Sequence, residues 1–435
     1  MTRAWAGCAP TIHSPTPAPP GAGPRLLAGW HETGAPANLD EHRRRYGRLP
    51  LHRRAGRPDQ LIEKVAAAGL RGRGGAGFPT ARKLAAVAAG RRRPLVLANG
   101  CESEPASAKD AALLNLAPHL VLDGAVLAAH ALGAAEAVVC AHQGALALHA
   151  LHRAIVERDD PVPIRVVAVP PRYVASEESA LIHFLNTGDA RPTTTPPRPS
   201  ERGVGGRPTL VDNVETLAHL ALIARFGAGW FRSVGTAELP GTLLITVDGA
   251  VRRPGVYEVP GGTALGAALQ CAGGLVEQVH AVLVGGYAGS WLAVPEALDA
   301  PLTHEGLRTA GAALGVAVLL ALPAEACGLA QTAHLLRYLA AESAGQCGPC
   351  TFGLPAIATD LAELVVGRGG HAVLERLTRR FAVIPRRGAC AHPDGAVRLA
   401  ASALPVFAAD LAEHLRGRRC AGAGHQPLFP IPGRR

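Results

Sequence analysis

Three cysteines in the last quarter of the chain have the spacing of ligands to a metal ion or a cluster. Cys347 and Cys350 form a C-x-x-C motif, and Cys390 follows in the segment GACAHPDG. Thiolates at this spacing reach one zinc ion or one iron–sulfur cluster. A thioredoxin-type redox pair would need a βαβ setting, whereas these cysteines lie among segments of helical periodicity. Two interpretations stay open: a structural zinc site with His392 as fourth ligand, and an iron–sulfur site.

A glycine-rich loop offers a second kind of chemistry. The segment GRGGAGFPT at 72–80 lies between two segments of helical periodicity. Glycines permit positive φ angles and bring the main chain close to a phosphate or a planar ring. Lys83 follows in a chain that has three lysines against 41 arginines. Because a compact ammonium reaches a phosphate or a flavin edge as a point charge, the loop is predicted to bind a nucleotide-like cofactor.

Two pairs of carboxylates complete the candidate site. Glu102 and Glu104 follow the predicted strand at 94–98, and Glu177 and Glu178 lie in a later loop. Ligands of open α/β sheets bind at the carboxyl ends of the strands. The two pairs are therefore predicted to lie opposite the glycine loop in one site.

The elements that must position these residues change in character along the chain. Strands alternate with helices between 94 and 169, which predicts an α/β layer with a largely parallel sheet. Strands at 242–247 and 255–259 with a helix at 265–272 predict a small β-grasp module, and 331–415 is almost entirely helical in pattern. The predicted fold is α/β plus α, with a tail or linker at 1–50, a cofactor-binding domain at 51–236, a β-grasp domain at 237–326, a helical domain with the cysteine site at 327–420 and a C-terminal tail at 421–435.

The composition limits the classes of function. The chain has 435 residues, 48% hydrophobic and 18% charged, with a formal net charge of +10, so it is predicted to be globular. Its arginines are scattered without interleaved aromatic residues, which argues against nucleic-acid binding. The longest apolar run, 310–324, is too short to cross a bilayer. We therefore expect a cytoplasmic protein with reduced thiols, in which the remaining cysteines are buried or incidental: Cys8, Cys140, Cys271, Cys327 and Cys420.

Motifs along most of the chain occur in the order seen in one family. They are GRGGAGFPT at 72–80 followed by Lys83, ESEP at 102–105 after Asn99, SEES at 176–179, DNVETL at 212–217, VDGAVRRPGVYEV at 247–259 and ESAGQCGPC at 342–350. Over roughly residues 50–420 the chain resembles the flavin-bearing, NADH-oxidising subunit of respiratory complex I (NADH:quinone oxidoreductase) and its relatives in soluble hydrogenases and formate dehydrogenases. The resemblance implies a Rossmann-like FMN domain, a β-grasp domain of the soluble-ligand-binding type, and a helical bundle that carries a [4Fe–4S] cluster.

The resemblance also implies an activity and a site. Electrons would pass from NADH through FMN and the cluster to a partner, either an acidic redox protein or a further oxidoreductase subunit. Glu104 and Lys83 are the implied catalytic contacts, with Glu104 orienting the nicotinamide or its bound water and Lys83 anchoring both nucleotides. The remaining implied contacts to FMN and NAD(H) are Gly72, Gly74, Phe78, Asn99, Glu102, Glu177, Glu178, Asn213 and Thr216, and the implied cluster ligands are Cys347, Cys350 and Cys390.

Departures from the family pattern leave an alternative open. Cys101 replaces an aspartate beside the flavin, and Ala86 and Arg198 stand where the family has aromatics that stack on adenine. Ala344 replaces the first of four cysteine ligands, so the three remaining thiolates would hold a [3Fe–4S] cluster, or a [4Fe–4S] cluster with His392, Ser343 or an outside group as fourth ligand. The alternative is an FMN- or ligand-binding scaffold of the same fold that has lost NADH oxidation or uses a different electron donor.

Overall fold

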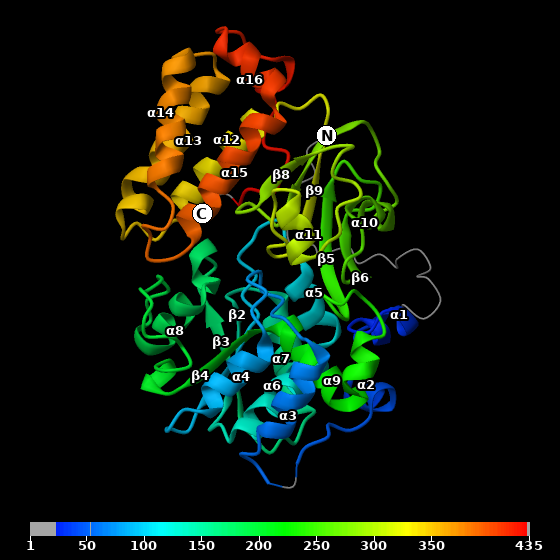
Figure 1. Ribbon diagram of the computed structural model, residues 1–435. Coiled ribbons are helices and arrows are strands. Elements are labelled where there is room, and N and C mark those ends of the chain that lie inside the picture. The colour runs from blue at the N-terminus through cyan, green and yellow to red at the C-terminus, as the bar shows by residue number, and fades with distance from the viewer. Residues whose placement is uncertain (1–22, 53, 433–435) are drawn as a thin grey trace.

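Four parallel strands form the first sheet of the computed structural model, which describes residues 23–432 except residue 53. Their order is β3-β2-β1-β4 (Figure 1). The inner strand β1 is apolar and buried over its first four residues, as expected for a parallel strand that is covered on both faces. The strands are β1 (Leu95–Asn99), β2 (Ala137–His142), β3 (Ile164–Val169) and β4 (Thr209–Asn213).

Helices on both faces bury this sheet and confirm the predicted α/β layer. Two long helices, α6 and α9, pack against each other so closely that a Cβ on Gly124 of α6 would collide with the carbonyl of Leu217 in α9. Glycine is therefore required at this contact. The helices of this part are α3 (Asp59–Ala68), α4 (Thr80–Ala88), α5 (Lys109–Leu116), α6 (Pro118–Leu132), α7 (Leu146–Val156), α8 (Glu178–Thr187) and α9 (Val214–Arg232), with short 3-10 turns η1 (Tyr173–Ser176) and η2 (Val204–Gly206).

The second sheet has five strands in the order β6-β5-β9-β7-β8. Strands β5 and β9 run parallel, and the other neighbours are antiparallel. The strands β7, β8 and β9 were not among the elements predicted from the sequence. The elements are β5 (Thr242–Gly249), β6 (Gly255–Pro260), α10 (Leu265–Cys271), β7 (Val279–Val284), β8 (Ser290–Ala293), α11 (His304–Thr309) and β9 (Val318–Pro323).

A helical bundle packs on the second sheet and shares its apolar core. The indole N–H of Trp291 in β8 donates a hydrogen bond to Thr332 Oγ1 over 2.9 Å, and its ring contacts Phe407 edge-on. Figure 1 shows the bundle beside this sheet and above α8. Its elements are α12 (Gly328–Ala341), the π-helical turn η3 (Pro349–Gly353), α13 (Leu354–Val365), α14 (Gly370–Val383), α15 (His392–Val406), α16 (Ala408–Leu415) and the 3-10 turn η4 (Ala421–Gly424).

Parts of the two predicted tails are ordered and packed. Helices α1 (Ala28–Thr33) and α2 (Leu39–Tyr46) lie within the predicted tail at 1–50. The carboxylate of Glu258 in β6 accepts the backbone N–H groups of residues 25–27, and Leu26 is fully buried. At the other end, Phe429 is buried against the bundle. A distant buried carboxylate leaves no periodic pattern in the local sequence, which explains why the anchor was not predicted; residues 1–22 and 433–435 lie outside the described residues.

The helices are short relative to the thickness of a bilayer. Within residues 23–432, no helix by itself is both long and apolar enough to cross a bilayer. Two sharply bent pairs, α5 with α6 and α15 with α16, reach the required length and composition together.

Candidate functional site

The carboxyl ends of β1 and β4 bring two predicted site residues together. Asn99 and Asn213 are register partners at the last positions of these adjacent strands. The Nδ2 group of Asn99 donates to the Ser176 carbonyl over 2.8 Å, and that of Asn213 donates to Asp110 Oδ2 over 2.7 Å. The chain passes from β1 to β2 and β3 on one side and returns to β4 on the other, so these ends lie at the topological switch point, where such sheets bind ligands.

The glycine loop crosses the same edge of the sheet. The N–H of Gly72 donates to the Phe78 carbonyl over 2.9 Å, which closes the loop. A Cβ on Gly74 would lie 3.3 Å from Cβ of Asn213, so the main chain passes directly beside the end of β4. Gly74 and Phe78 are both exposed. The loop therefore presents bare main chain and one aromatic face to a ligand.

Lys83, near the start of α4, lies close to two carboxylates. Its Nζ donates to the Val211 carbonyl over 2.8 Å and lies 3.7 Å from Asp212 Oδ1 and 3.6 Å from Glu178 Oε2. Burial raises the pKa of Asp212 to about 6, although Lys83 opposes the shift. The second oxygen of Asp212 is buried and has no hydrogen-bond partner among the described residues. Because buried polar atoms are normally satisfied, this oxygen is a natural acceptor for a hydroxyl group of a ligand.

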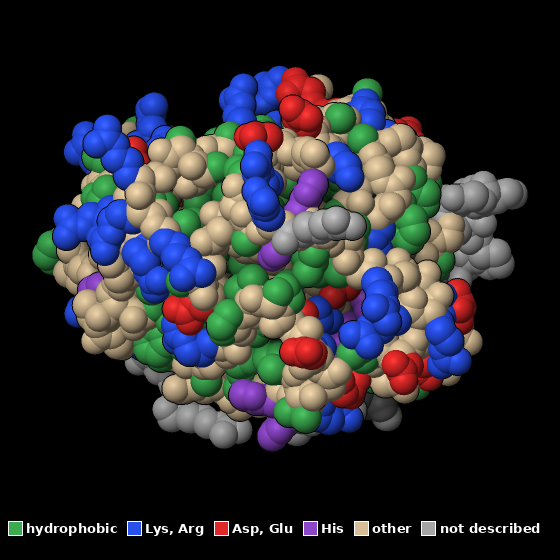
Figure 2. Space-filling view, turned by 90° about the horizontal axis from the view of Figure 1, so that it is seen from below, with side chains coloured by type: hydrophobic (Ala, Val, Ile, Leu, Met, Phe, Trp, Pro, Cys, Tyr) green, Lys and Arg blue, Asp and Glu red, His purple; other side chains and the backbone are tan. Residues whose placement is uncertain are grey.

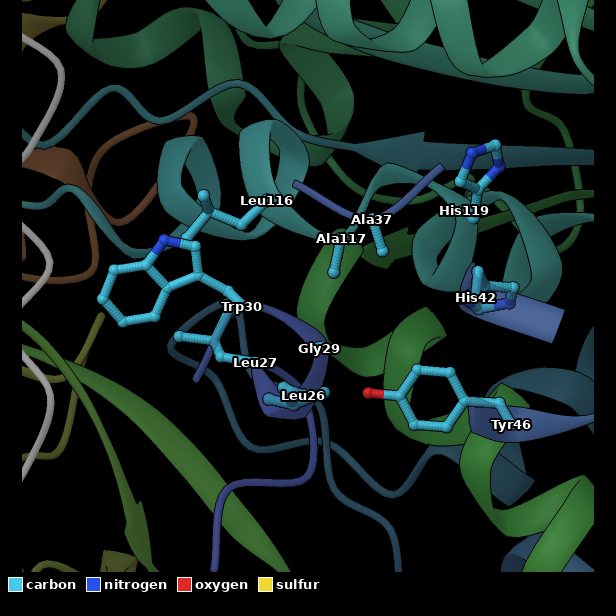
Figure 3. A pocket seen from close by; sticks show the side chains of 10 residues that line it. All are labelled: Leu26, Leu27, Gly29, Trp30, Ala37, His42, Tyr46, Leu116, Ala117 and His119. Atoms are coloured by element: carbon cyan, nitrogen blue, oxygen red, sulfur yellow. The ribbon is translucent and has the colours of Figure 1, made fainter. Parts of the chain in front are cut away.

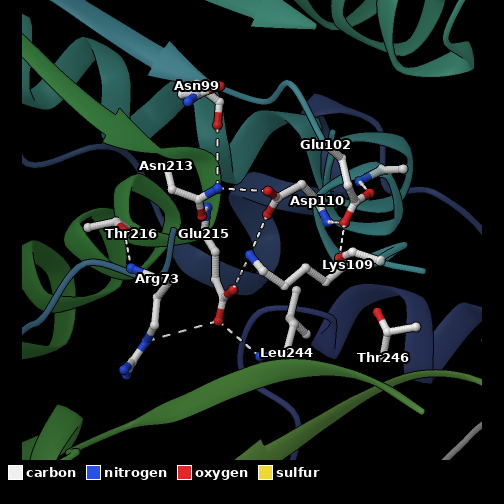
Figure 4. A network of polar contacts seen from close by, with 12 residues as sticks. Arg73, Asn99, Glu102, Lys109, Asp110, Asn213, Glu215, Thr216, Leu244 and Thr246 are labelled. Carbon is white, nitrogen blue, oxygen red and sulfur yellow. Dashed lines mark hydrogen bonds and ion pairs between the residues drawn. The ribbon is translucent and has the colours of Figure 1, made fainter. Parts of the chain in front are cut away.

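A buried network of polar and charged side chains contacts the glycine loop (Figure 4). Lys109 Nζ donates to Asp110 Oδ1 over 2.6 Å and to Glu215 Oε2 over 2.9 Å. The other oxygen of Glu215 accepts a backbone N–H of β5, which ties the second sheet to the site. Thr216 is fully buried, and its hydroxyl oxygen accepts the N–H of Arg73 over 2.8 Å. Thr216 thus holds the main chain of the glycine loop.

Glu102 faces α5. Its carboxylate accepts the N–H groups of Asp110 and Ala111 over 3.1 and 3.0 Å, and the hydroxyl of Ser107 also donates to it. Burial raises the pKa of Glu102 to about 7, with a further contribution from Asp110. The predicted contact residue therefore caps the helix whose Asp110 holds Asn213.

Glu104 is buried between the two sheets. Its Oε2 accepts the hydroxyl of Tyr173 over 3.0 Å and the N–H of Tyr287 over 2.8 Å. Burial raises the pKa of Glu104 to about 7, while these hydrogen bonds oppose the shift. A Cβ on Gly286 would lie 2.7 Å from the same oxygen, so the second sheet closes tightly over this carboxylate.

The three predicted cluster ligands form one group. Burial raises the pKa of Cys350 and of Cys390; Cys347 further raises the pKa of Cys350, and its charge also acts to raise the pKa of Cys390, so the three thiols lie close to one another. Cys347 accepts two backbone N–H groups, and Cys350 and Cys390 accept one or more each. Amide donors of this kind stabilise thiolates and surround cluster sulfurs. The donor set fits an iron–sulfur cluster.

The fourth position of the cysteine group carries no protein thiol. Ala344 stands there and has no ligand atom. Nε2 of His392 is engaged with the Leu339 carbonyl over 2.8 Å, and its Nδ1 has no partner among the described residues. A carbonyl oxygen only accepts, so Nε2 carries the proton and Nδ1 is the ring nitrogen that remains free for a ligand.

Glu177 lies between the candidate cofactor site and the cysteine group. Its carboxylate caps α8 by accepting two N–H groups of the first turn. Burial raises the pKa of Cys390, and the charge of Glu177 adds to this. The side chain of Gln346 donates to the Pro192 carbonyl in the loop after α8. The cysteine loop therefore packs against the cofactor-binding part of the chain.

A separate pocket contains none of these residues (Figure 3). It lies where the N-terminal segment meets the start of α6, and His42 Nε2 in its lining lies 2.7 Å from Asp123 Oδ2. Its lining consists of Leu26, Leu27, Gly29, Trp30, Ala37, His42, Tyr46, Leu116, Ala117 and His119.

The residues of this site fit FMN. Bare loop main chain, the Lys83 ammonium and the unpaired oxygen of Asp212 match a planar ring, a phosphate and hydroxyl groups in turn. Cys101 replaces the family's aspartate and is buried among apolar side chains of the sheet. A thiol has no oxygen, so the hydrogen-bond acceptor that an aspartate would provide is missing at this position.

Sequence reasoning missed several members of this site. Asp212 is the first residue of the motif DNVETL, but the sequence did not indicate a role for it. Tyr173 and Tyr287 lie outside the motifs, and no pattern around them indicates a site. Lys109 had one signal, the rarity of lysine in this chain.

Three family models match the chain. They are the Nuo51 FMN-binding domain over 65–222, the SLBB domain over 244–286 and the NADH-ubiquinone oxidoreductase-F iron-sulfur binding region over 330–414. Together with the site, they define an oxidoreductase subunit that has an FMN-binding domain and an iron–sulfur binding region.

Curated relatives and solved structures extend the match over most of the chain. The F subunit of NADH-quinone oxidoreductase from Streptomyces coelicolor is 33% identical over 91% of this chain and 92% of the relative, and that from Escherichia coli is 33% identical over 80% and 83%. The chain belongs to the family of NADH-quinone oxidoreductase F subunits. A chain of an NAD+-reducing [NiFe]-hydrogenase in the air-oxidised state superimposes with a TM-score of 0.78 at 31% identity, covering 92% of this chain and 67% of that chain.

The family membership confirms several sequence predictions. The chain is an NADH dehydrogenase-type oxidoreductase that uses FMN and an iron–sulfur cluster, with a mixed α/β fold and an SLBB domain. The roles of individual residues, the domain boundaries and the acidic partner stay predictions.

Proposed function

We propose that the chain oxidises NADH at the carboxyl edge of the first sheet and passes electrons through a cluster at the cysteine group to a partner subunit. The observation that carries this proposal is the position of Glu177 and Glu178. Glu178 lies 3.6 Å from Lys83, and the charge of Glu177 reaches Cys390. The cofactor site and the cluster site are therefore neighbours, as electron transfer between them requires.

The Rossmann-like FMN domain is assigned to 51–236, the β-grasp domain to 237–326 and the helical cluster domain to 327–420. FMN, when bound, supplies the conversion between hydride transfer and single-electron transfer. Thr216 and Glu102 act as positioning residues, because each holds backbone next to the site. The residues that would contact FMN directly are Gly72, Gly74, Lys83, Asn99, Glu177, Glu178 and Asn213.

NADH is assigned to Phe78, Lys83 and Glu104. The exposed ring of Phe78 offers a stacking face beside the loop. The ionised carboxylate of Glu104 accepts hydrogen bonds and would orient the nicotinamide or a water bound to it. Lys83 places a positive charge next to both nucleotides.

One observation favours a second candidate, a scaffold that has lost NADH oxidation. Ala86 is exposed one helical turn after Lys83, so the α4 surface lacks an aromatic face for adenine. Arg198 is also exposed, and a guanidinium stacks on an aromatic ring and attracts phosphate. We assign Arg198 the compensating contact, which keeps NADH oxidation as the preferred function.

The cluster is assigned as [3Fe–4S], held by Cys347, Cys350 and Cys390, because Ala344 carries no ligand atom in the first ligand position. The partner is assigned as an acidic redox protein or subunit. The chain carries a net charge of +10, and Figure 2 shows Lys and Arg side chains gathered along the left part of the face seen from below. A positive surface steers an acidic partner toward the molecule.

Anaerobic reduction tests the function. The full chain, reconstituted with FMN, is mixed with NADH and followed by absorbance at the flavin band and then by EPR. We expect the flavin band to bleach and a cluster signal to change. If FMN binds but stays oxidised at millimolar NADH, NADH oxidation is refuted and the scaffold, or another electron donor, becomes the better account.

A further inference from the structure

A second group of thiols lies at the opposite end of α12 from the cluster ligands. The ligand atoms of Cys327, His414 and Cys420 all lie within 4.8 Å of one another. Cys327 Sγ is 3.4 Å from His414 Nε2. In a tetrahedral zinc site with ordinary bond lengths, sulfur and nitrogen ligands lie roughly 3.5 to 3.8 Å apart. The observed spacing would need to open by only a few tenths of an ångström to hold a zinc ion.

The imidazole of His414 is oriented for coordination. His414 is fully buried, and its Nδ1 lies 3.1 Å from the Arg418 carbonyl. A carbonyl oxygen accepts hydrogen bonds only, so Nδ1 carries the proton and Nε2 has a free lone pair that faces Cys327. Metal-ligating histidines generally donate their other ring N–H in this way.

The backbone around the thiols is held in place from three segments. Cys327 is the N-cap of α12, and its sulfur accepts the N–H of Ala330 over 3.4 Å. A Cβ on Gly422 would collide with the backbone nitrogen of Cys327, so the turn after Cys420 packs directly on the start of α12. Ion pairs of Glu413 with arginines 416 and 418 fix the turn that leads from His414 to Cys420.

A group that can hold a fourth ligand lies on the same helix as the histidine. Asp410 lies one turn before His414 in α16. Its carboxylate hydrogen-bonds the Cys420 side chain, and its charge also acts on Cys327. The Asp410 carboxylate does not belong to the group of ligand atoms that lie within 4.8 Å of one another, so we assign it to hold a water in the fourth position.

We propose that Cys327, His414 and Cys420 bind one structural Zn²⁺ ion, with a water held by Asp410 in the fourth position. On binding, the two thiol protons leave to solvent, the two thiolates coordinate, and His414 contributes the lone pair of its Nε2 atom without gaining or losing a proton. This site is separate from the cluster site, because the 14 residues of α12 lie between them and span roughly 20 Å. Zinc has no redox change, so its role is to tie α16 and the C-terminal turn to the junction of β9 and α12.

Zinc binding by the full chain tests this assignment. The variant C347S/C350S/C390S, purified anaerobically and treated with chelator, removes the competing thiols. We expect it to take up about one Zn²⁺ per chain, and Co²⁺ in its place to give a thiolate-to-cobalt absorption band. Adding C327S and C420S to this background should abolish both the uptake and the band.

Milder variants keep the test interpretable if the buried substitutions do not fold. Cys420 is partly exposed, so C420S alone should fold and weaken the cobalt band, and D410N should weaken zinc affinity about tenfold. The C271S variant, which removes a thiol outside the group, should bind Zn²⁺ as its parent does. The proposal is overturned if the triple variant binds no Zn²⁺, if C327S/C420S leaves binding unchanged, or if anaerobically purified wild type carries a Cys327–Cys420 disulfide in place of zinc.

Discussion

The hydroxyl of Tyr173 donates a hydrogen bond to Glu104 Oε2 over 3.0 Å. The same oxygen accepts the backbone N–H of Tyr287, which belongs to the second sheet's domain. The carboxylate is thus fixed by one residue that follows β3 of the first sheet and one that follows β7 of the second. Burial nevertheless raises its pKa to about 7, so its charge changes near neutral pH.

The first prediction concerns the pH dependence of NADH oxidation. If ionised Glu104 orients the nicotinamide, the rate rises as pH increases through about 7. Glu104→Gln should remove this dependence and lower the rate. In Tyr173→Phe the carboxylate loses a donor that stabilises its charge, so the pKa of Glu104 rises and the midpoint moves to higher pH. Steady-state rates of the three proteins between pH 5.5 and about 8.5 check this; identical profiles would exclude Glu104 as the titrating group.

The same carboxylate makes stability depend on pH. Its folded-state pKa of about 7 lies above the usual value near 4.5, so between these pH values the folded chain holds a proton that the unfolded chain has lost. Stability therefore falls as pH rises through this window, by on the order of 2–3 kcal/mol. Urea unfolding at pH 5 and pH 7.5 should show a smaller fall in Glu104→Gln. Glu102 and Asp212, with raised pKa values of about 7 and 6, contribute equally to both proteins.

A further prediction concerns Lys83, one of only three lysines in the chain. Lys83→Met should raise the dissociation constants of FMN and NADH roughly ten- to a hundredfold, because a charged donor contributes about 1.5–3 kcal/mol. Lys64 is exposed on α3, and Lys64→Met is the matched control with unchanged affinities. Flavin fluorescence titration measures both. Equal affinities in Lys83→Met and the control would exclude Lys83 from the site.

Substitution of Lys109, in contrast, should lower the stability of the fold. Its ammonium is buried between Asp110 and Glu215, and these carboxylates hold the pKa of Lys109 above its usual value despite burial. Lys109→Met leaves two buried carboxylates without the ammonium that lies between them, so unfolding should become easier by about 3–5 kcal/mol. The urea midpoint measures this, again with Lys64→Met as control; a midpoint unchanged from wild type would contradict the role of the network in Figure 4.

The sequence predicted those elements that carry a local pattern. The helix at 118–132 and the strand around 95–99 have periodicity and turn signals within a few residues, and both occur in the structure. Motif order was sufficient to place the glycine loop, Lys83 and the cysteine group in one family. Each of these features depends on neighbours in the chain.

Features that depend on distant contacts were not predicted. Glu258 anchors residues 25–27 from β6, and Glu104 is held by tyrosines far along the chain. Cys327 and His414 meet only because α16 folds back onto the start of α12. No window of sequence contains both partners, so such contacts become visible only in three dimensions.

The last prediction concerns the missing cluster ligand. With Ala344 in the first ligand position, the wild-type protein should contain about three irons per chain after anaerobic reconstitution, because three thiolates hold a [3Fe–4S] cluster. Ala344→Cys adds the fourth thiolate and should raise the content to about four, with a corresponding change in the EPR spectrum. Ala340→Cys, in the last turn of α12, adds a thiol outside the ligand position and should leave iron unchanged. Four irons in wild type would show that another group completes the cluster, and iron lost in Cys390→Ser would still confirm the cysteine group as its site.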